Sequence, residues 1–141
     1  MQHQTSKADQ QFQKEFETCA TELSDFNHRA HVRLAYIYLC IGSIDEAYVQ
    51  IRRGLLRYLE YNSINTVKYS VTSTRAWIMA VRHFMQSATL CHSAGELVAQ
   101  YPQLLDGNIM LSHYTKERLF SNEASKRFMQ ADIEAIPEYA A

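Results

Sequence analysis

The sequence contains little glycine and little proline. Its 141 residues include only 4 Gly and 2 Pro. A sandwich of β-strands needs many tight turns, and these two residue types form a large share of them. A shortage of chain breakers is typical instead of long helices joined by short loops. We therefore predict an all-α fold.

Cysteine is also scarce. Cys19, Cys40 and Cys91 are odd in number and far apart, and none belongs to a CxxC pair or a metal-finger pattern, so a disulfide framework is not expected. The polar N-terminal stretch MQHQTSKADQQFQKEF has no apolar segment of the kind found in a secretory signal. The longest apolar run, LAYIYLCI, has 8 residues, too few to cross a bilayer. We expect a protein of the reducing cytoplasm with no membrane association.

Neither sign of charge is in large excess. The formal net charge is -1, and 47% apolar with 21% charged residues is the profile of one folded domain. Residues 28–82 nevertheless carry 8 Lys/Arg against 3 Asp/Glu, and the segments on both sides are acidic. We interpret Arg52, Arg53 and Arg57 as a solvated face that the acidic ends partly neutralise. Nucleic acid is therefore not an expected partner.

The first part of the chain has a single apolar stripe. Phe12, Phe16, Cys19 and Leu23 recur with the period of a helix over residues 7–23. The other face consists of Gln, Lys and Glu, so we expect the helix to lie on the surface. We predict that residues 1–24 form an amphipathic N-terminal arm, and that this arm can support a homo-oligomer.

The clearest pattern belongs to a pair of helices in the middle of the chain. The first covers 27–41 and stops before Gly42, which is a good helix terminator. The second starts at Ile44, because Ser43 and Glu46 have the spacing of a capping box, and it runs to about residue 60. The connecting turn is so short that the two helices must form an antiparallel hairpin.

Further helices are predicted in the rest of the chain. One covers 67–85, although its β-branched first part has weak helix propensity. The stretch SAGE (93–96) is a second capping box, and its helix must stop before Pro102. Two or three further short helices follow, with breaks near Thr115 and Ser121.

These elements together predict one irregular helical bundle. We expect five to seven helices over residues 25–136, built on the antiparallel hairpin and followed by a tail at 137–141. No low-complexity segment and no second domain is indicated by the sequence.

One hairpin of the sequence resembles a tetratricopeptide repeat. In IYLCIGSIDEAYVQIRRGLLRYL, Tyr38, Gly42 and Ala47 match that repeat's packing positions, while Gly54 stands where a second Ala is usual. The chain holds no second copy of the pattern, and solenoids need about three units to be stable. The resemblance therefore implies shared hairpin packing and not a repeat protein.

A longer resemblance covers residues 26–137. FNHRAHVRLAYIYL, IRRGLLRYL, KYSVTSTRAW, YTKERLFSNEASKRF and DIEAIP are similar to a family of small, single-domain, all-helical bacterial proteins of uncharacterised function. The resemblance implies a compact helical fold and a recurring set of histidines. It also implies a histidine at the position where this chain has Ser70.

Two histidines at the head of an apolar helix are the main candidates for a functional site. His28 and His31 are spaced i, i+3, and Ala35 continues the same face, so both histidines point toward the core. A second set of polar residues precedes the apolar run AWIMAV on a later helix. The polar N-terminal ends of the two helices can meet at one end of the bundle and line a polar pocket. The predicted ligand-binding residues are His28, His31, Arg33, Tyr69, Ser70, Arg75, Trp77, His113 and Tyr114.

Three interpretations of the histidines remain open. They can be hydrogen-bonded structural groups. His28 and His31 can share a metal ion, which then needs a third ligand. They can also serve a ligand or acid–base site, because histidine titrates near neutral pH and arginine binds anions.

The sequence thus favours a small intracellular binding or accessory protein whose polar pocket holds a small anionic ligand or contacts a partner protein. The alternative is a small enzyme that uses His28 and His31 as metal ligands, or as acid and base, on a small metabolite. The identity of any cofactor stays unknown from the sequence.

Overall fold

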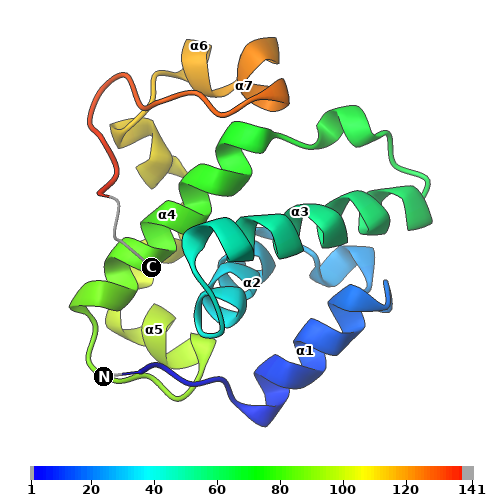
Figure 1. Cartoon of the computed structure of the whole chain (residues 1–141), viewed down its shortest axis with the longest axis vertical. Helices are drawn as coiled ribbons and strands as arrows, with labels where there is room; N and C mark the ends of the chain where they lie inside the picture. The colour runs from blue at the N-terminus through cyan, green and yellow to red at the C-terminus, as the bar shows by residue number, and fades with distance from the viewer. Residues whose placement is uncertain (1, 138–141) are drawn as a thin grey trace.

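The computed structural model describes residues 2–137, and every regular element within them is helical. The predicted all-α bundle is confirmed (Figure 1). None of the helices in this range is long and apolar enough to cross a membrane. The α-helices are α1 Lys7–Glu17, α2 His28–Leu39, α3 Ile44–Tyr61, α4 Val71–Ser87, α5 Ala94–Gln100, α6 Lys116–Leu119 and α7 Asn122–Lys126. The 3-10 helices are η1 Leu23–Asp25, η2 Thr66–Lys68, η3 Pro102–Leu105 and η4 Gly107–Ser112.

The predicted hairpin is formed by α2 and α3, and α2 is the most enclosed element of the bundle. Helices α1, α3, α4 and α5 all pack against α2. The capping box at the start of α3 is complete: the Glu46 N–H donates to Ser43 Oγ at 3.1 Å, and the Ser43 N–H donates to Glu46 Oε1 at 2.9 Å. Helix α2 carries apolar residues around most of its circumference because it is covered on several sides.

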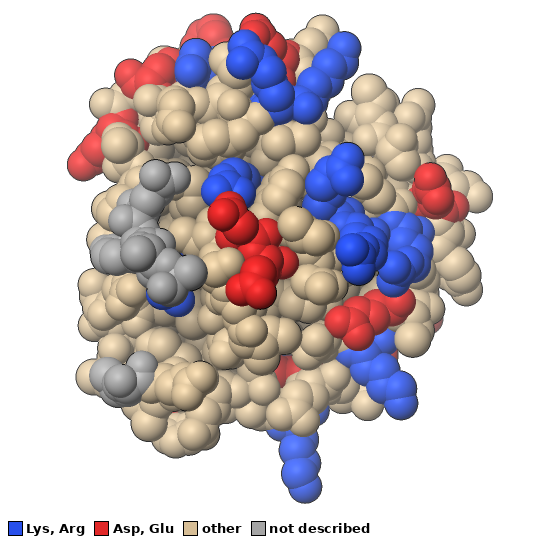
Figure 2. Space-filling view, viewed as in Figure 1, with Lys and Arg blue, Asp and Glu red and all other residues tan. Residues whose placement is uncertain are grey.

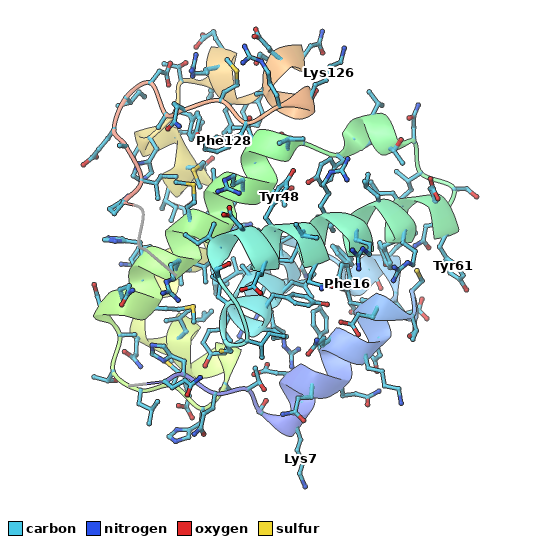
Figure 3. All side chains as sticks on the ribbon, viewed as in Figure 1. Lys7, Phe16, Tyr48, Tyr61, Lys126 and Phe128 are labelled. Carbon is cyan, nitrogen blue, oxygen red and sulfur yellow. The ribbon has the colours of Figure 1, made fainter. Side chains whose placement is uncertain are left out.

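Helix α1 packs on the main core through the buried Phe16, and the partly buried Phe12 packs beside the same cluster. Phe16 is fully buried and belongs to the same apolar cluster as residues of α2 and α3 (Figure 3). The ring occupies the space where a side chain at Gly54 would otherwise stand, because a Cβ at that position would lie 2.3 Å from Phe16 Cε2. Gly54 therefore lets α1 approach α3 closely, which is the usual reason for a glycine inside a packed helix.

A single buried carboxylate connects three helices. Asp9 accepts hydrogen bonds from the Ser6 N–H at the start of α1 (3.1 Å), from the Ala94 N–H at the start of α5 (3.0 Å) and from Arg33 Nε of α2 (3.0 Å). Its side chain is only 2% exposed. A buried carboxylate must be paired and hydrogen-bonded to be tolerated, and here two helix N-termini and a guanidinium provide both.

The residues before α1 are also held against the bundle. His3 Nε2 lies 2.8 Å from the Met85 carbonyl oxygen, and the Cys91 N–H donates to His3 Nδ1 at 3.1 Å. The Gln4 N–H donates to the Cys91 carbonyl at 2.9 Å. The N-terminal segment thus lies beside the loop between α4 and α5.

Two helix boundaries differ from those predicted. Helix α1 ends at Glu17 and not at Leu23, since Cys19 takes a left-handed conformation (φ 61) that turns the chain out of the helix. The fourth helix begins at Val71, because Ser70 is extended and its hydroxyl accepts from the Ser73 N–H at 3.2 Å. The short helix η2 occupies the residues before it.

The C-terminal third consists of short helices, of which α5 and η3 pack on α2 and α7 packs on α4. The predicted breaks at Thr115 and Ser121 are confirmed, because each residue caps the helix that follows it. The fully buried Thr72 hydroxyl donates to the Arg127 carbonyl (2.8 Å) and accepts from the Met129 N–H (3.0 Å). This region has a second apolar cluster, centred on Met110, Tyr114 and Leu119. Of the predicted tail, 137–141, all but Pro137 lies outside the described residues.

Candidate functional site

A cavity of about 650 Å³ opens between η1, α2, α3 and the start of α4. The first residues of α2 and of α4 both contribute to its wall, so the two polar helix heads recognised in the sequence share one concave site. Its volume is within the usual range for small-molecule sites. The lining residues are Leu23, Phe26, Asn27, His28, His31, Ala35, Ile51, Leu55, Tyr58, Leu59, Ile64, Lys68, Tyr69, Ser70, Ser73, Thr74, Trp77, Ile78 and Phe120.

His28 is held in place by two contacts. Its Nε2 lies 2.9 Å from the Leu104 carbonyl oxygen, and its ring meets the edge of Trp77 with the centroids 4.4 Å apart. A carbonyl oxygen only accepts hydrogen bonds, so the ring must donate from Nε2. In the neutral ring, Nδ1 is therefore an acceptor.

The imidazole of His31 has no hydrogen bond to any described residue, and the side chain keeps an exposed surface. That surface belongs to the cavity wall, and the ring is flanked by Phe26 with the centroids 4.8 Å apart. Loss of bulk water around the ring, followed by the proximity of His28, lowers the pKa of His31 to about 4. At neutral pH His31 is therefore an uncharged imidazole that a ligand can reach.

The start of α4 supplies the second polar group of the cavity. The Thr74 hydroxyl donates to the Ser70 carbonyl at 2.8 Å, and the Tyr69 hydroxyl donates to the Tyr48 hydroxyl at 3.2 Å. Burial raises the pKa of Tyr69, so its phenol is protonated at physiological pH. The Ser73 hydroxyl has no partner among the described residues and remains available to a ligand.

The remaining wall is mostly apolar and aromatic. Ile51, Leu55 and Leu59 come from α3, and the rings of Phe26 and Tyr58 stack with their centroids 4.5 Å apart. Leu23 and Phe120 also belong to the lining although they are 51% and 71% exposed. They therefore form an apolar part of the mouth.

Five of the nine residues predicted for the pocket line this cavity. They are His28, His31, Tyr69, Ser70 and Trp77.

The two predicted arginines have other surroundings. Arg33 pairs with Asp9 on another side of α2 and lies over the Phe12 ring at 4.6 Å. Arg75 pairs with Asp45 at 2.7 Å and lies between the rings of Tyr48 and Phe128, 5.7 Å from each centroid. Neither guanidinium lines the cavity.

The predicted pair His113 and Tyr114 also lies outside the cavity lining. Tyr114 is buried in the second apolar cluster, and its hydroxyl donates to the Met129 carbonyl at 2.7 Å. His113 Nδ1 lies 2.7 Å from the Glu134 carbonyl oxygen. These contacts attach the C-terminal segment to the bundle.

Fourteen of the nineteen lining residues are absent from the predicted set, and Lys68, Asn27 and Phe120 are three instructive examples. Lys68 directly precedes the predicted Tyr69 and Ser70, so its position beside the helix head was available as a signal. Asn27 precedes His28 and caps α2 by accepting from the Ala30 N–H at 3.1 Å, which is a recognisable N-cap pattern. Phe120 reaches the cavity from the distant turn after α6, and no local pattern indicated it.

Within residues 2–137, no three His, Cys, Asp or Glu side chains are grouped so that they could hold a metal ion. His28 and His31 therefore have no third donor of these types beside them in the part of the chain that the structure describes.

The basic side chains of α3 occupy a different face. Figure 2 shows Lys and Arg side chains gathered over this helix, and Arg52, Arg53 and Arg57 line a groove there together with Glu60. Arg57 donates to the Glu17 carbonyl at 3.1 Å, and Arg52 lies 6.0 Å from the Tyr69 ring centroid. The basic side chains on this face are thus in contact partly with solvent and partly with neighbouring protein groups.

No family model, no curated protein and no solved structure matches the chain.

Proposed function

We propose that this protein is a small binding or accessory protein that holds a small anionic ligand in the cavity between α2, α3 and α4. The cavity carries the proposal, because the N-terminal ends of two helices of 12 and 17 residues meet at its wall. Each helix N-terminus carries about half a positive charge and several N–H groups without intrahelical partners. Such ends favour an anion.

The charges of the lining agree with this proposal. Lys68 is the one Lys or Arg among the described lining residues, and none of those residues is Asp or Glu. The histidines contribute in another way than charge, since the lowered pKa of His31 leaves it neutral at pH 7. It can then donate or accept one hydrogen bond and help to orient a ligand.

The lowered pKa of His31 also bears on the enzyme alternative. An acid–base catalyst works best when its pKa is near the operating pH. With a pKa of about 4, His31 is a weak base at pH 7. Binding therefore has more support than proton transfer for this residue.

The proposal is tested by blocking the cavity. Ser73→Phe places a ring at a lining position whose hydroxyl has no hydrogen-bond partner within residues 2–137. Ser87→Phe makes the same exchange at the exposed end of the same helix and is the matched control. Each protein is mixed with a small-molecule extract of cells, separated from unbound compounds and analysed by mass spectrometry after denaturation.

We expect wild type and Ser87→Phe to retain the same anionic compound and Ser73→Phe to lose it. Retention of no compound by the folded wild type, or equal retention by Ser73→Phe, contradicts the proposal. Circular dichroism of each variant shows that the loss does not result from unfolding.

A further inference from the structure

We infer that the ligand of this cavity is an amphipathic organic anion, with one acidic head attached to an apolar body. The inference rests on the proposed function and goes further by naming the chemical class. The distribution of polar and apolar groups around the cavity carries it.

We place the acidic head of the ligand beside the start of α4. Lys68 lies three residues before the first residue of this helix, and Ser73 contributes a hydroxyl that no described residue engages. An ammonium, a free hydroxyl and a helix N-terminus are the groups that bind carboxylate, sulfate or phosphate. Because the described lining contains a single cationic side chain, one acidic group satisfies it.

We place the apolar body of the ligand against α3 and the following turn of α4. Ile51, Leu55 and Leu59 present an aliphatic wall on α3, and Trp77 with Ile78 faces the same cavity from α4. A bare inorganic anion would leave the partly exposed Leu59 and Trp77 of this wall in contact with water. Apolar surface gains free energy when a ligand covers it, so the wall favours an organic ligand.

The mouth extends the apolar surface outward. Leu23 and Phe120 come from opposite ends of the sequence and are both exposed at the cavity. Exposed apolar side chains beside a concave site commonly mark a place that a ligand covers. The body of the ligand can therefore continue past the cavity toward Phe120.

A neutral hydrocarbon is a poorer fit than the anion. It would cover the apolar wall but would leave Lys68 and the N-terminal N–H groups of α4 without an anionic partner. Removing water from such groups without replacing its hydrogen bonds costs free energy. An acid is therefore expected to bind better than a neutral compound of the same shape.

Trp77 makes this comparison direct, because it is the only tryptophan of the chain and it lines the cavity. We compare 4-phenylbutanoate, its neutral amide 4-phenylbutanamide and inorganic phosphate. Binding is followed by tryptophan fluorescence and by isothermal titration calorimetry. We expect the acid to bind about tenfold more tightly than the amide, and more tightly than phosphate.

Lys68→Met tests the position of the head. It is expected to weaken the acid about threefold or more while leaving the affinity of the amide unchanged. Arg53→Met removes a cation from the outer face of α3, outside this cavity, and is expected to change neither affinity.

The outcomes separate this inference from the proposed function. Equal affinity of acid and amide, equal affinity of acid and phosphate, or an unchanged acid affinity in Lys68→Met overturns the amphipathic anion. Failure of the acid to bind, when the wild type does retain a compound from the cell extract, also overturns it and leaves the proposed function standing. If neither the acid nor any extracted compound binds, both proposals fail.

Discussion

The replacement Gly54→Ala tests how α1 is attached to the bundle, because two effects of opposite sign compete there. Gly54 lies inside the amphipathic helix α3. Alanine is favoured over glycine in a helix interior by about 1 kcal/mol. An added Cβ would however lie 2.3 Å from Phe16 Cε2 and 2.4 Å from Phe16 Cζ. These distances are far below a van der Waals contact, so a neighbour must move.

The ring of Phe16 has little room to move. It is 0% exposed, and Phe26 lies beside it with the ring centroids 5.8 Å apart. Overpacking a core typically costs about 1–3 kcal/mol and occasionally more. The two very short distances to a buried ring place the cost in the upper part of that range, at about 2–3 kcal/mol. After the gain of about 1 kcal/mol in helix propensity, we expect Gly54→Ala to lower the free energy of unfolding by about 1–2 kcal/mol.

Urea unfolding followed by circular dichroism measures this change. Gly95→Ala in α5 is the matched control, because the nearest heavy atom to its added Cβ is Ser93 Oγ at an ordinary 3.7 Å. We expect the control to be neutral or stabilising by up to about 1 kcal/mol. In the double variant with Phe16→Leu, the smaller side chain should recover part of the loss, with a coupling of at least about 0.5 kcal/mol. A Gly54→Ala protein as stable as wild type, or strictly additive effects, would refute the reasoning.

Three further predictions concern charged and titratable groups. Asp9→Asn should lower the free energy of unfolding by about 1.5–3 kcal/mol, because a charged acceptor serving three donors is lost. In the same urea assay, Glu60→Gln at an exposed position should change this free energy by less than about 0.5 kcal/mol. The pKa of His31 is about 4 in the folded protein and about 6.5 in the unfolded chain, so the free energy of unfolding should fall as the pH drops from 6.5 toward 4. In the variant His31→Asn this free energy should fall less steeply. Parallel curves for the two proteins, from urea unfolding at several pH values, would contradict this. Burial raises the pKa of Cys40 to about 11, so iodoacetamide should label it far more slowly in the native protein than in urea at pH 7.5, and equal labelling rates would argue against the buried thiol.

The features that follow from local chemistry were predictable from the sequence. Ser43, Thr115 and Ser121 are short polar residues at the first position before a helix, and each accepts a hydrogen bond from the backbone of that helix. The spacing of apolar residues similarly determined the hairpin of α2 and α3. At Ser93 the prediction was half right, since the Ser93 hydroxyl accepts from the Glu96 N–H but the Glu96 carboxylate accepts from the His92 N–H.

The features that depend on distant residues were not predictable. Arg33 was expected in the pocket, but its partner Asp9 lies 24 positions earlier in the sequence, and only the packing of α1 brings the two together. The left-handed Cys19 that ends α1 has no local signal, because cysteine shows no preference for that conformation. For the candidate site, the two helix heads could be recognised locally, whereas Phe120 depends on the fold of the whole chain.

The attachment of Asp9 to the start of α5 has a consequence for the order in which the protein forms during synthesis. The acceptor is made early, but the Ala94 N–H that it binds is made 85 residues later. At about 5–20 residues per second, that interval lasts several seconds. Once α2 and α3 have been made, α1 can pack on them through Phe16 while its carboxylate still lacks the Ala94 N–H. Helix α1 is therefore translated before the other described helices and is among the last of them to complete its bonds.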